Sequence, residues 1–516
     1  MERTGRPKGE PDSDRIGHSS RGVAALRKRY SHARLGLLRI RFDGEEWKCR
    51  VWQAVSGFSY RPLAHACCQC GRKDFTRIMG NDQYHILTKP IGPLCNLDCK
   101  YCFYLEKAKL YPGATWAMRG EVLENYIRQY INSQDTEAIS FAWQGGEPTL
   151  LGVEFFERVV ALQAQYSDGR KIDNAFQTNG VLLDDEWGEF LKINNFLVGI
   201  SIDGPRDLHD AYRLDKGGQG TFDKVMRGIS VLKKHGVEFN TLTTVHRVNS
   251  QHPLEVYHFL KEVGSGYMQF IPIVERASSV TTEDGLTLVS SAFAEQAAVT
   301  KWSVEPLQFG KFLTAIFDEW VRNDVGRQYI QLFDVSLGMW IGMPASLCIF
   351  RRTCGSALAM EHNGDVYSCD HFVYSENKLG NIMDLPLRTM VDSRQQREFG
   401  NAKMDTLPQY CRCCEVRFAC NGECPKHRFL KTPDGESGLN YLCAGYKHFF
   451  NHIDPYMRFM ALQLQQKRAP ANVMEWIRVQ EAGYQAQTNE APGRNDPCPC
   501  ASGKKAKRCC FDPRRP

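Results

Sequence analysis

The stretch CNLDCKYCFY at residues 95–104 decides the fold, because it places three cysteines at C-x3-C-x2-C spacing directly after a largely apolar run. The three are Cys95, Cys99 and Cys102. Three thiolates cannot fill the ligand positions of a four-iron cube, so one iron stays open to a small molecule that can accept an electron there. A three-cysteine zinc site completed by a distant histidine is the alternative for this motif alone. The spacing therefore predicts a metal centre.

Composition limits the classes of function that fit this chain. Its 516 residues predict roughly two to four domains. A formal net charge of +6 from 65 basic and 59 acidic residues is too small to imply nucleic-acid binding. We expect no membrane span and a cytoplasmic protein, since no apolar run is long enough and residues 1–30 lack the apolar core of a signal peptide. Twenty cysteines then favour metal ligation over disulfides.

Residues 1–80 differ from the rest of the chain, because they are basic and show no sustained helix or strand period. Met79 stands just before the first strand-like run. We expect translation to start there, which makes residues 1–78 an over-extended reading frame. The alternative is a zinc site formed by Cys67, Cys68 and Cys70, with Cys49 as a further ligand.

Strand-like and helix-like segments alternate from residue 83 to residue 275. The strand-like runs are 84–91, 138–143, 174–177, 196–202, 239–245 and 267–274, and the helical stretches include 119–131, 153–166, 221–235 and 253–263. Repeated β-α units form a parallel sheet. The unusual residues follow strand ends, and in a β/α barrel the loops after the strands converge on one mouth. We therefore predict an α/β fold that begins with a partial (β/α)6 barrel.

Three motifs in this region resemble the radical S-adenosylmethionine (SAM) enzymes. They are CNLDCKYCFY, WQGGEP at 143–148, and SIDGP at 201–205 followed by Tyr212 and Arg213. The resemblance implies that the three cysteines of the first motif bind a [4Fe-4S] cluster. The open iron of that cluster would take the amino and carboxylate groups of SAM.

The same resemblance implies a set of SAM contacts. Tyr101 and Gly146 would contact SAM at the cluster. Ser201 and Arg213 would hold its ribose and carboxylate, and Val274 would lie on the last strand beside the adenine. Three of these residues have an ordinary alternative when taken alone: the glycine forms a turn, the arginine is a surface cation and the valine is a core side chain.

A second cysteine group follows a helix-rich connector. Its eight cysteines make two complete sets of four and resemble the SPASM extension, which binds two auxiliary [4Fe-4S] clusters. By that resemblance one cluster is held by Cys348, Cys354, Cys369 and Cys424, and the other by Cys411, Cys414, Cys420 and Cys443. Cys413 is an extra thiol in this pattern. Zinc sites are the alternative, because zinc ribbons also use C-x2-C pairs.

The run NGDVYSCDH at 363–371 resembles the anaerobic sulfatase-maturating enzymes, a SPASM branch that converts a Cys or Ser of a sulfatase into Cα-formylglycine. By this resemblance Asp370 is the catalytic base. A base is needed because formation of C=O or C=S after loss of a Cβ hydrogen also requires loss of the O–H or S–H proton. His371 is the rival base, and an acid that solvates the cluster loop is the ordinary alternative. Tyr104 and Gln144 are expected to contact the substrate peptide.

The resemblance also implies the partners. The substrate would be an unfolded or nascent sulfatase polypeptide with a C/S-x-P-x-R segment, and a flavodoxin or ferredoxin would be the reductant. Two other functions compete: a SPASM peptide modifier that forms thioether or carbon–carbon links, and a non-catalytic iron-sulfur or zinc protein for electron transfer or regulation. The SCDHF context at 368–372 favours sulfatase maturation.

The C-terminal end carries a last cysteine motif, C-x-C-x8-C-C, after a helical stretch at 456–466. It resembles the SEC-C motif, which implies a zinc ion held by Cys498, Cys500, Cys509 and Cys510. By analogy the motif tethers the chain to a partner such as the translocation machinery. A disordered tail is the alternative.

The expected domains follow from these motifs. They are an atypical extension at 1–80, the barrel at 81–300, a helical connector at 301–345, the SPASM domain at 346–450, a helical linker at 451–490 and the SEC-C motif at 491–512.

Overall fold

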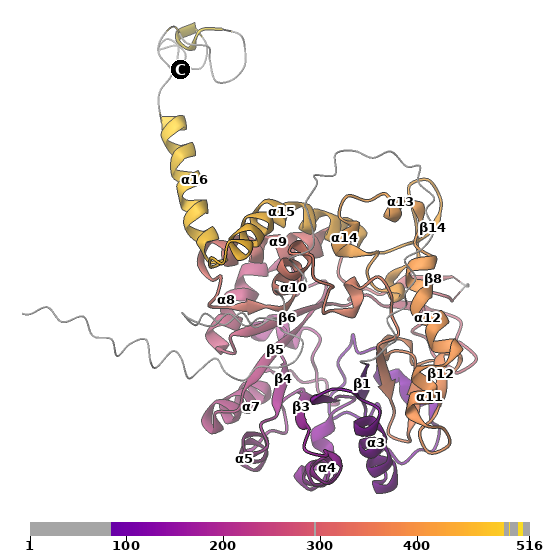
Figure 1. The fold of residues 1–516 in the computed structure, drawn as a ribbon. Helices are drawn as coiled ribbons and strands as arrows, with labels where there is room; N and C mark the ends of the chain where they lie inside the picture. Colours follow the sequence, from indigo (N-terminus) through magenta and orange to yellow (C-terminus); the bar gives the residue numbers. More distant parts are fainter. Residues whose placement is uncertain (1–83, 294–295, 490–494, 496–503, 509–516) are drawn as a thin grey trace, which may run out of the picture. The chain divides into compact units, whose positions relative to one another are not determined.

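In the computed structural model, which describes residues 84–293, 296–489, 495 and 504–508, the chain forms a ten-stranded sheet (Figure 1). The strand order is β12-β11-β10-β1-β2-β3-β4-β5-β6-β9. Six central strands run parallel in sequence order, as the repeated β-α units predict. They are β1 (His85–Thr88), β2 (Ala138–Trp143), β3 (Lys171–Thr178), β4 (Leu197–Ser201), β5 (Phe239–Val245) and β6 (Tyr267–Pro272). The predicted partial (β/α)6 arrangement is confirmed.

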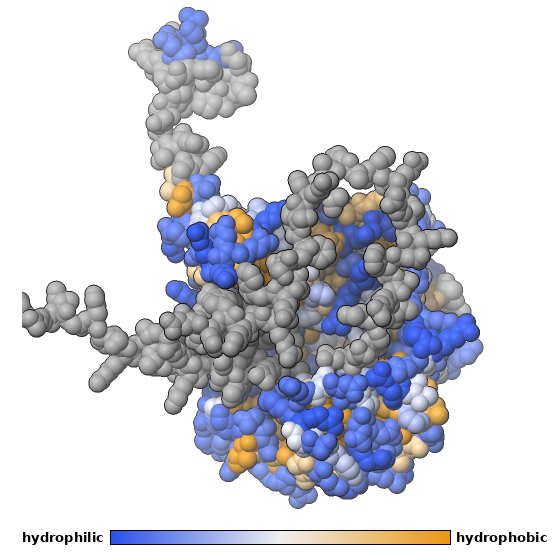
Figure 2. Space-filling model, in the orientation of Figure 1, coloured by the Kyte–Doolittle hydropathy of each residue, from blue (hydrophilic) through white to orange (hydrophobic). Residues whose placement is uncertain are grey.

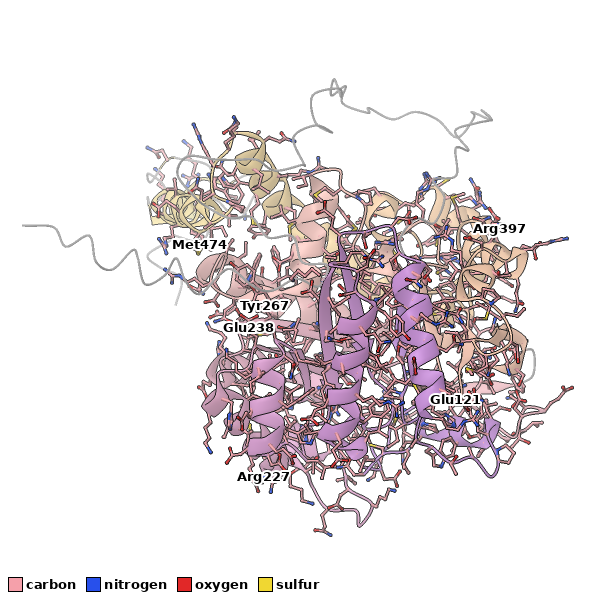
Figure 3. All side chains as sticks on the ribbon, turned by 60° about the horizontal axis from the view of Figure 1, so that its bottom comes forward. Glu121, Arg227, Glu238, Tyr267, Arg397 and Met474 are labelled. Atoms are coloured by element: carbon pink, nitrogen blue, oxygen red, sulfur yellow. The ribbon has the colours of Figure 1, made fainter. Side chains whose placement is uncertain are left out.

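Helices connect the parallel strands and lie side by side against the sheet (Figure 3). They are α3 (Gly120–Asn132), α4 (Val153–Tyr166), α5 (Asp185–Ile193), α6 (Arg206–Asp210), α7 (Phe222–His235) and α8 (Pro253–Val263). The sequence patterns had not indicated α5. Its start is nevertheless encoded, because the Asp184 side chain accepts a hydrogen bond from the Trp187 N–H and so caps the helix.

The cysteine-rich half of the chain extends the same sheet. Strand β10 (Ala357–Met360) pairs in parallel with β1, and β11 (Asp365–Tyr367) and β12 (Lys378–Asn381) continue as antiparallel strands. At the other edge, β9 (Tyr329–Ile330) pairs with β6. The regions that the motifs separate into barrel, connector and SPASM domain therefore share one sheet.

The remaining helices and strands lie outside this sheet. The longer helices are α9 (Pro306–Asn323), α10 (Gln331–Trp340), α12 (Arg394–Asp405), α15 (Cys443–Gln465) and α16 (Asn472–Asn489). The short helices and strands are α11 (Leu387–Val391), α13 (Gln409–Arg412), α14 (Arg417–Cys420), β7 (Arg276–Ser278), β8 (Ala297–Val299), β13 (Leu430–Lys431) and β14 (Ser437–Leu439). The 3-10 helices that matter below are η1 (Leu105–Leu110) and η5 (Asp370–Phe372). Helix α15 starts at a cysteine and is longer than the helical stretch expected at 456–466.

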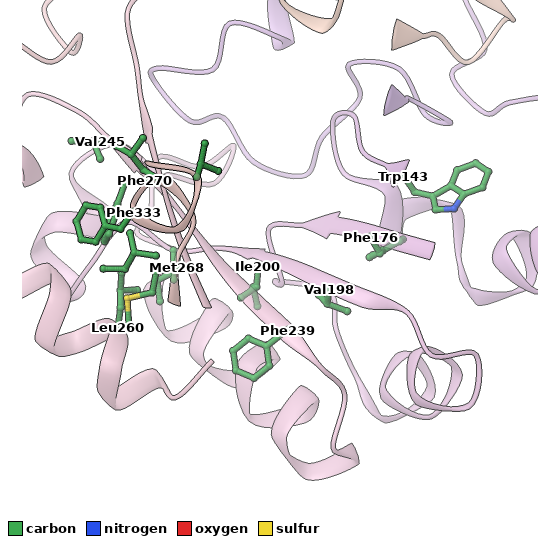
Figure 4. Packing of buried hydrophobic residues seen from close by; sticks show 14 of the residues in the cluster. Trp143, Phe176, Val198, Ile200, Phe239, Val245, Leu260, Met268, Phe270 and Phe333 are labelled. Carbon is green, nitrogen blue, oxygen red and sulfur yellow. The ribbon is translucent and has the colours of Figure 1, made fainter. Parts of the chain in front are cut away.

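Apolar side chains from successive strands form the core between the sheet and its helices (Figure 4). Trp143 of β2, Phe176 of β3, Ile200 of β4 and Phe239 of β5 all belong to this cluster. Burial of each such side chain contributes about 1.5–3 kcal/mol to folding. The core thus fixes the strand ends on which the functional residues sit.

The surface that Figure 2 presents is mostly hydrophilic, with scattered apolar residues. Among the described residues, no helix is both long enough and apolar enough to span a membrane. The hypotheses on residues 1–80, including the start at Met79 and the zinc site at Cys67, Cys68 and Cys70, lie outside the described residues, and so do Cys498, Cys500, Cys509 and Cys510.

Candidate active site

The loop that carries the first three cysteines follows β1 and is fastened to the loop after β4. The Asp98 N–H donates to the Leu214 carbonyl at 2.9 Å, and the Lys100 N–H donates to the Tyr212 carbonyl at 3.0 Å. Burial raises the pKa of Cys95 and of Cys99 to about 12. The Cys102 thiol raises the pKa of both, and Cys95 also raises the pKa of Cys99. Three partly buried thiols thus face one another after β1, although the surrounding protein does not favour their thiolate forms.

Four of the residues that resemblance assigns to SAM lie after the carboxyl ends of three parallel strands: Tyr101 after β1, Gly146 after β2, and Ser201 and Arg213 at and after the end of β4. Arg213 donates from Nε to Asp203 Oδ2 at 2.9 Å, and the Tyr101 hydroxyl donates to the same oxygen at 2.5 Å. Ser201 ends β4 and is buried. Burial by itself raises the pKa of Asp203, but Arg213 and neighbouring histidines hold the pKa of this carboxyl below its usual value. Arg213 is therefore a buried ion-pair partner rather than a surface cation.

Gly146 is required by the packing of two loops. A Cβ atom at this position would lie 1.8 Å from the Leu94 carbonyl oxygen, which belongs to the segment just before Cys95. The Gly146 N–H donates to the Gly92 carbonyl at 2.7 Å. The resemblance attributes this glycine to close approach of SAM, and the structure adds a close approach of the chain's own backbone.

Val274 lies outside the last parallel strand. Strand β6 ends at Pro272, so the expectation that Val274 belongs to this strand is wrong by two residues. Beyond Pro272 the Ile273 N–H still donates to the Val245 carbonyl of β5 at 3.0 Å, but the Ile273 carbonyl accepts from the Val304 N–H, also at 3.0 Å, and not from a strand. Val274 is 2% exposed and packs in the main core cluster.

Asp370 forms a buried ion pair with a residue that sequence reasoning missed. The Lys89 Nζ lies 2.5 Å from Asp370 Oδ1. Lys89 directly follows β1 and is 1% exposed, while Asp370 begins η5 in the cysteine-rich half. Burial alone raises the pKa of Asp370, but Lys89 and other charges hold it below its usual value. A charged residue directly after an apolar strand was the available signal for Lys89.

Tyr104 lies beside this ion pair. The Lys89 Nζ is 4.1 Å from the centre of the Tyr104 ring, and the Tyr104 hydroxyl donates to Glu361 Oε1. Glu361 directly follows β10 and is fully buried. Gln144 directly follows β2, where its N–H donates to the Thr88 carbonyl at 2.9 Å. The two expected substrate residues therefore lie on the same side of the sheet as Lys89 and Asp370, at the carboxyl ends of its parallel strands.

His371, the rival base, faces a different group. Its Nδ1 lies 3.5 Å from the Cys424 Sγ, and its ring packs edge-on against Phe103. Burial lowers the pKa of His371 to about 3, so this imidazole is neutral near pH 7. His371 therefore contacts one of the cysteines that the SPASM resemblance assigns to an auxiliary cluster.

The eight cysteines of the second group separate into two neighbourhoods. Cys411, Cys414, Cys420 and Cys443 line one pocket together with Tyr446 and Lys447. In the other set burial is the largest cause of the raised pKa of each thiol. Cys348 also raises the pKa of Cys354 and Cys369, and Cys354 and Cys369 raise the pKa of Cys424. These are the two sets that the SPASM resemblance implies.

Two further observations bear on metal chemistry. Cys413 is exposed and accepts a hydrogen bond from the Gln409 side-chain amide at 3.1 Å, apart from the pocket lining. Among the described residues, no three His, Cys, Asp or Glu side chains are grouped so as to hold a single metal ion. Buried thiols whose protein surroundings disfavour the thiolate form fit metal or cluster ligation, because a coordinating metal supplies the missing positive charge.

Comparison with protein families gives three matches. Residues 90–260 match the radical SAM superfamily, residues 348–415 match an iron-sulfur cluster-binding domain named SPASM, and residues 494–512 match the SEC-C motif. A serine-type anaerobic sulfatase-maturating enzyme of Bacteroides thetaiotaomicron is 50% identical over 395 residues, which span 76% of this chain and 95% of that enzyme. This chain belongs to the anaerobic sulfatase-maturating enzymes.

Other members of the family agree. A cysteine-type anaerobic sulfatase-maturating enzyme of Clostridium perfringens is 35% identical over 72% of this chain and 96% of its own length. The solved structure described as native anSMEcpe with bound AdoMet superposes with a TM-score of 0.65 at 34% identity, covering 74% of this chain and 99% of that one. A related structure also contains the Cp18Cys peptide.

The resemblance inferred from the motifs is therefore confirmed. The chain is a radical SAM oxidoreductase of this family, with iron-sulfur clusters and SAM as its cofactors. Its substrate is a peptide or sulfatase polypeptide in the manner of that family.

Proposed function

We propose that this protein oxidises a Ser or Cys side chain of a sulfatase polypeptide to Cα-formylglycine. The observation that carries the proposal is the Lys89–Asp370 pair. It places a carboxylate that is 13% exposed against a buried lysine, at the strand ends that also carry the first cysteine motif. A proton acceptor at that place is what the dehydrogenation needs.

The cofactors have candidate ligands. Cys95, Cys99 and Cys102 would hold the cluster that binds SAM, and the two sets of four would hold the auxiliary clusters. Tyr101, Gly146, Ser201 and Arg213 would contact SAM, and Val274, although beyond β6, remains a candidate neighbour of the adenine. When bound and reduced, the cluster and SAM together supply a carbon radical that removes one hydrogen atom from the substrate Cβ.

Asp370 would then take the substrate proton. A Ser side chain becomes an aldehyde by losing one hydrogen atom, one proton and one electron. The hydrogen atom would go to the carbon radical, and the electron would go to an auxiliary cluster held by one of the two sets of four cysteines. The hydroxyl becomes strongly acidic as the electron departs. A carboxylate of low pKa can accept such a proton. Lys89 would keep this carboxylate ionised and oriented, because the ammonium group lies 2.5 Å from it. His371 is a weaker candidate because its ring contacts Cys424.

Serine is the better candidate for the substrate side chain. The relative that is 50% identical carries the serine-type name, whereas the cysteine-type relative of Clostridium perfringens is 35% identical. Paired peptides with a Ser-x-P-x-R or Cys-x-P-x-R segment, incubated without oxygen with reductant and SAM, test this directly. Mass spectrometry should show loss of two hydrogen atoms from the Ser peptide, and exchange of hydrogen sulfide for oxygen in the Cys peptide.

The same incubation separates the competing functions. A thioether or carbon–carbon crosslink also removes two hydrogen atoms, but only an aldehyde is captured by a hydrazide reagent. A non-catalytic electron-transfer protein would form no 5′-deoxyadenosine. Either result in place of hydrazide-reactive product contradicts the proposal.

The metal content and the partners complete the proposal. Three [4Fe-4S] clusters correspond to about twelve iron atoms per chain, and the SEC-C residues Cys498, Cys500, Cys509 and Cys510 would hold one zinc ion. Metal analysis of the anaerobically purified protein tests both numbers. We also propose a flavodoxin or ferredoxin as reductant, action in the cytoplasm before the sulfatase folds, and a translocation-machinery contact through the SEC-C motif.

A further inference from the structure

Two oppositely charged residues lie side by side because two strands from distant parts of the chain are in register. In the β1–β10 pair, Thr88 is opposite Met360. The next residues, Lys89 and Glu361, therefore leave the sheet at the same edge, and the Lys89 N–H donates to the Met360 carbonyl at 2.8 Å. Strand register thus places a lysine and a glutamate beneath the loop of the first cysteine motif.

Tyr104 contacts both Lys89 and Glu361. Its ring lies 4.1 Å from the Lys89 Nζ, and its hydroxyl donates to Glu361 Oε1. Tyr104 is 4% exposed and Glu361 is fully buried. The second carboxyl oxygen, Oε2, lies 3.7 Å from the His362 Nδ1 and makes no hydrogen bond to the described residues. Tyr104 is therefore the hydrogen-bond partner that the structure gives this buried glutamate.

The surroundings of Glu361 do not explain a carboxyl group by packing alone. Tyr104 belongs to a small apolar cluster with Ala359, Tyr367 and Val373. A carboxyl group buried beside such a cluster costs free energy unless it is paired or hydrogen-bonded. An aliphatic side chain at this position would fill the space at a lower cost in folding free energy. We therefore infer that the carboxyl group serves to make a hydrogen bond.

That purpose follows from the chemistry of the phenol. A tyrosine hydroxyl has one proton to donate and two lone pairs that accept. Since Glu361 takes the proton, the oxygen of Tyr104 can only accept. The substrate hydroxyl or thiol is expected to donate to Asp370, and the arginine of the C/S-x-P-x-R segment lies four residues further along the peptide. The donors nearest the reacting side chain are therefore backbone N–H groups.

We propose that Glu361 is a positioning residue that fixes Tyr104 as a hydrogen-bond acceptor for a backbone N–H of the substrate peptide. This inference rests on the proposed function. The contact uses the peptide backbone, so it serves Ser and Cys substrates alike. It also makes β10, from the cysteine-rich half, part of the peptide-binding site.

A double-mutant cycle tests the inference. The Glu361→Gln substitution keeps the shape of the side chain, but its amide can donate to the Tyr104 oxygen and occupy the lone pair. We expect KM for the peptide to rise about tenfold, while kcat changes less than about threefold, because a binding contact common to ground and transition states is lost. The Tyr104→Phe substitution should raise KM by a similar factor, and the double variant should be no worse than Tyr104→Phe alone.

Tyr367→Phe is the matched control. It removes a hydroxyl from the same cluster, but that hydroxyl pairs with Tyr111 at 2.7 Å and makes no hydrogen bond to Glu361. Its KM should stay within about twofold of the wild-type value. If Glu361→Gln does not fold, the single Tyr104→Phe and Tyr367→Phe variants still decide, because equal KM values for the two overturn the inference.

The outcomes separate the inference from the proposed function. If the wild-type protein makes no formylglycine from the peptide, the proposed function fails. If the wild type makes it, the inference is overturned when the effects of Glu361→Gln and Tyr104→Phe multiply in the double variant, or when Glu361→Gln leaves KM unchanged. A tenfold rise in KM that disappears in the Tyr104→Phe background supports it.

Discussion

Two buried ion pairs lie at the carboxyl ends of the barrel strands, and they are built differently. Asp203 and Arg213 come from one loop after β4, only ten residues apart. Lys89 and Asp370 come from opposite halves of the chain and meet because β10 pairs with β1. The first pair can form as soon as one β-α unit folds, whereas the second needs the complete sheet. In the proposed roles of Arg213 and Asp370, SAM binding depends on an ion pair within the barrel, whereas proton removal depends on an ion pair between the two halves of the chain.

The largest expected effect is on proton removal. Asp370→Asn keeps the shape of the side chain but removes the proton acceptor. We expect formylglycine formation to fall by about 10²- to 10⁴-fold, while 5′-deoxyadenosine is still formed. Product and 5′-deoxyadenosine are quantified from the same anaerobic reaction. Asp392→Asn, which affects an exposed pair with Arg388, is the control, and undiminished product from Asp370→Asn would remove Asp370 from its role.

The second effect concerns the Asp203–Arg213 pair. Asp203→Asn leaves the buried Arg213 guanidinium without its counter-charge, and breaking a buried pair in this way costs about 3–5 kcal/mol of stability. Thermal melting of the anaerobic protein should show a large fall in Tm, with weaker SAM binding. Asp207→Asn, at an exposed position of the same segment, is the matched control. Equal Tm values for the two variants would show that the Asp203–Arg213 pair does not hold this loop.

The third effect concerns the Lys89–Asp370 pair, which joins the two halves of the chain. Lys89→Met removes the ammonium group but keeps the apolar stem, and a lost charged hydrogen bond is worth about 1.5–3 kcal/mol. We expect formylglycine formation to slow by about 10- to 100-fold, with partial rescue by Lys89→Arg. Rates for the three proteins are compared at saturating SAM. If Lys89→Arg is as slow as Lys89→Met, the charge of Lys89 is not what Asp370 requires.

The smallest expected effect is a pH dependence of the folding stability, caused by His209 beside Asp203. His209 accepts from the Asp203 N–H at Nδ1 (3.3 Å) and contacts Thr221 Oγ1 through Nε2 (3.1 Å). Burial lowers its pKa to about 3, so the folded state favours the neutral ring. Its stabilising contribution is therefore complete above the unfolded pKa of about 6.5 and is lost as pH falls toward 3. The loss has reached about 1.4 kcal/mol at pH 5.5.

Melting curves check this pH dependence. The fall in Tm between pH 7.5 and pH 5.5 should be smaller for His209→Gln than for the wild type, because glutamine does not titrate in this range. His252→Gln, at a histidine about half exposed in its side chain, gives the control. An identical pH dependence in His209→Gln and the wild type would contradict the assigned neutral state.

Local patterns predicted much of the fold and site, and the limits have a physical cause. The parallel strands follow from periods within short windows, whereas the division of the eight cysteines into two sets of four came from the SPASM resemblance. Lys89 and Glu361 were not predicted as functional residues, since their role depends on the β1–β10 pairing, which no local period encodes. The end of β6 at Pro272 was also missed, because the apolar run continues through Val274 although the ladder does not.

The shared sheet also constrains how the chain can be divided. Because β10 covers one edge of β1, a version of the protein cut before the cysteine-rich half would expose the unpaired N–H and C=O groups of that strand. An open edge of this kind recruits strands from other molecules. The barrel is therefore not an autonomous module to which cluster domains were appended, and a truncated barrel is expected to aggregate rather than to persist as a minimal SAM-cleaving enzyme.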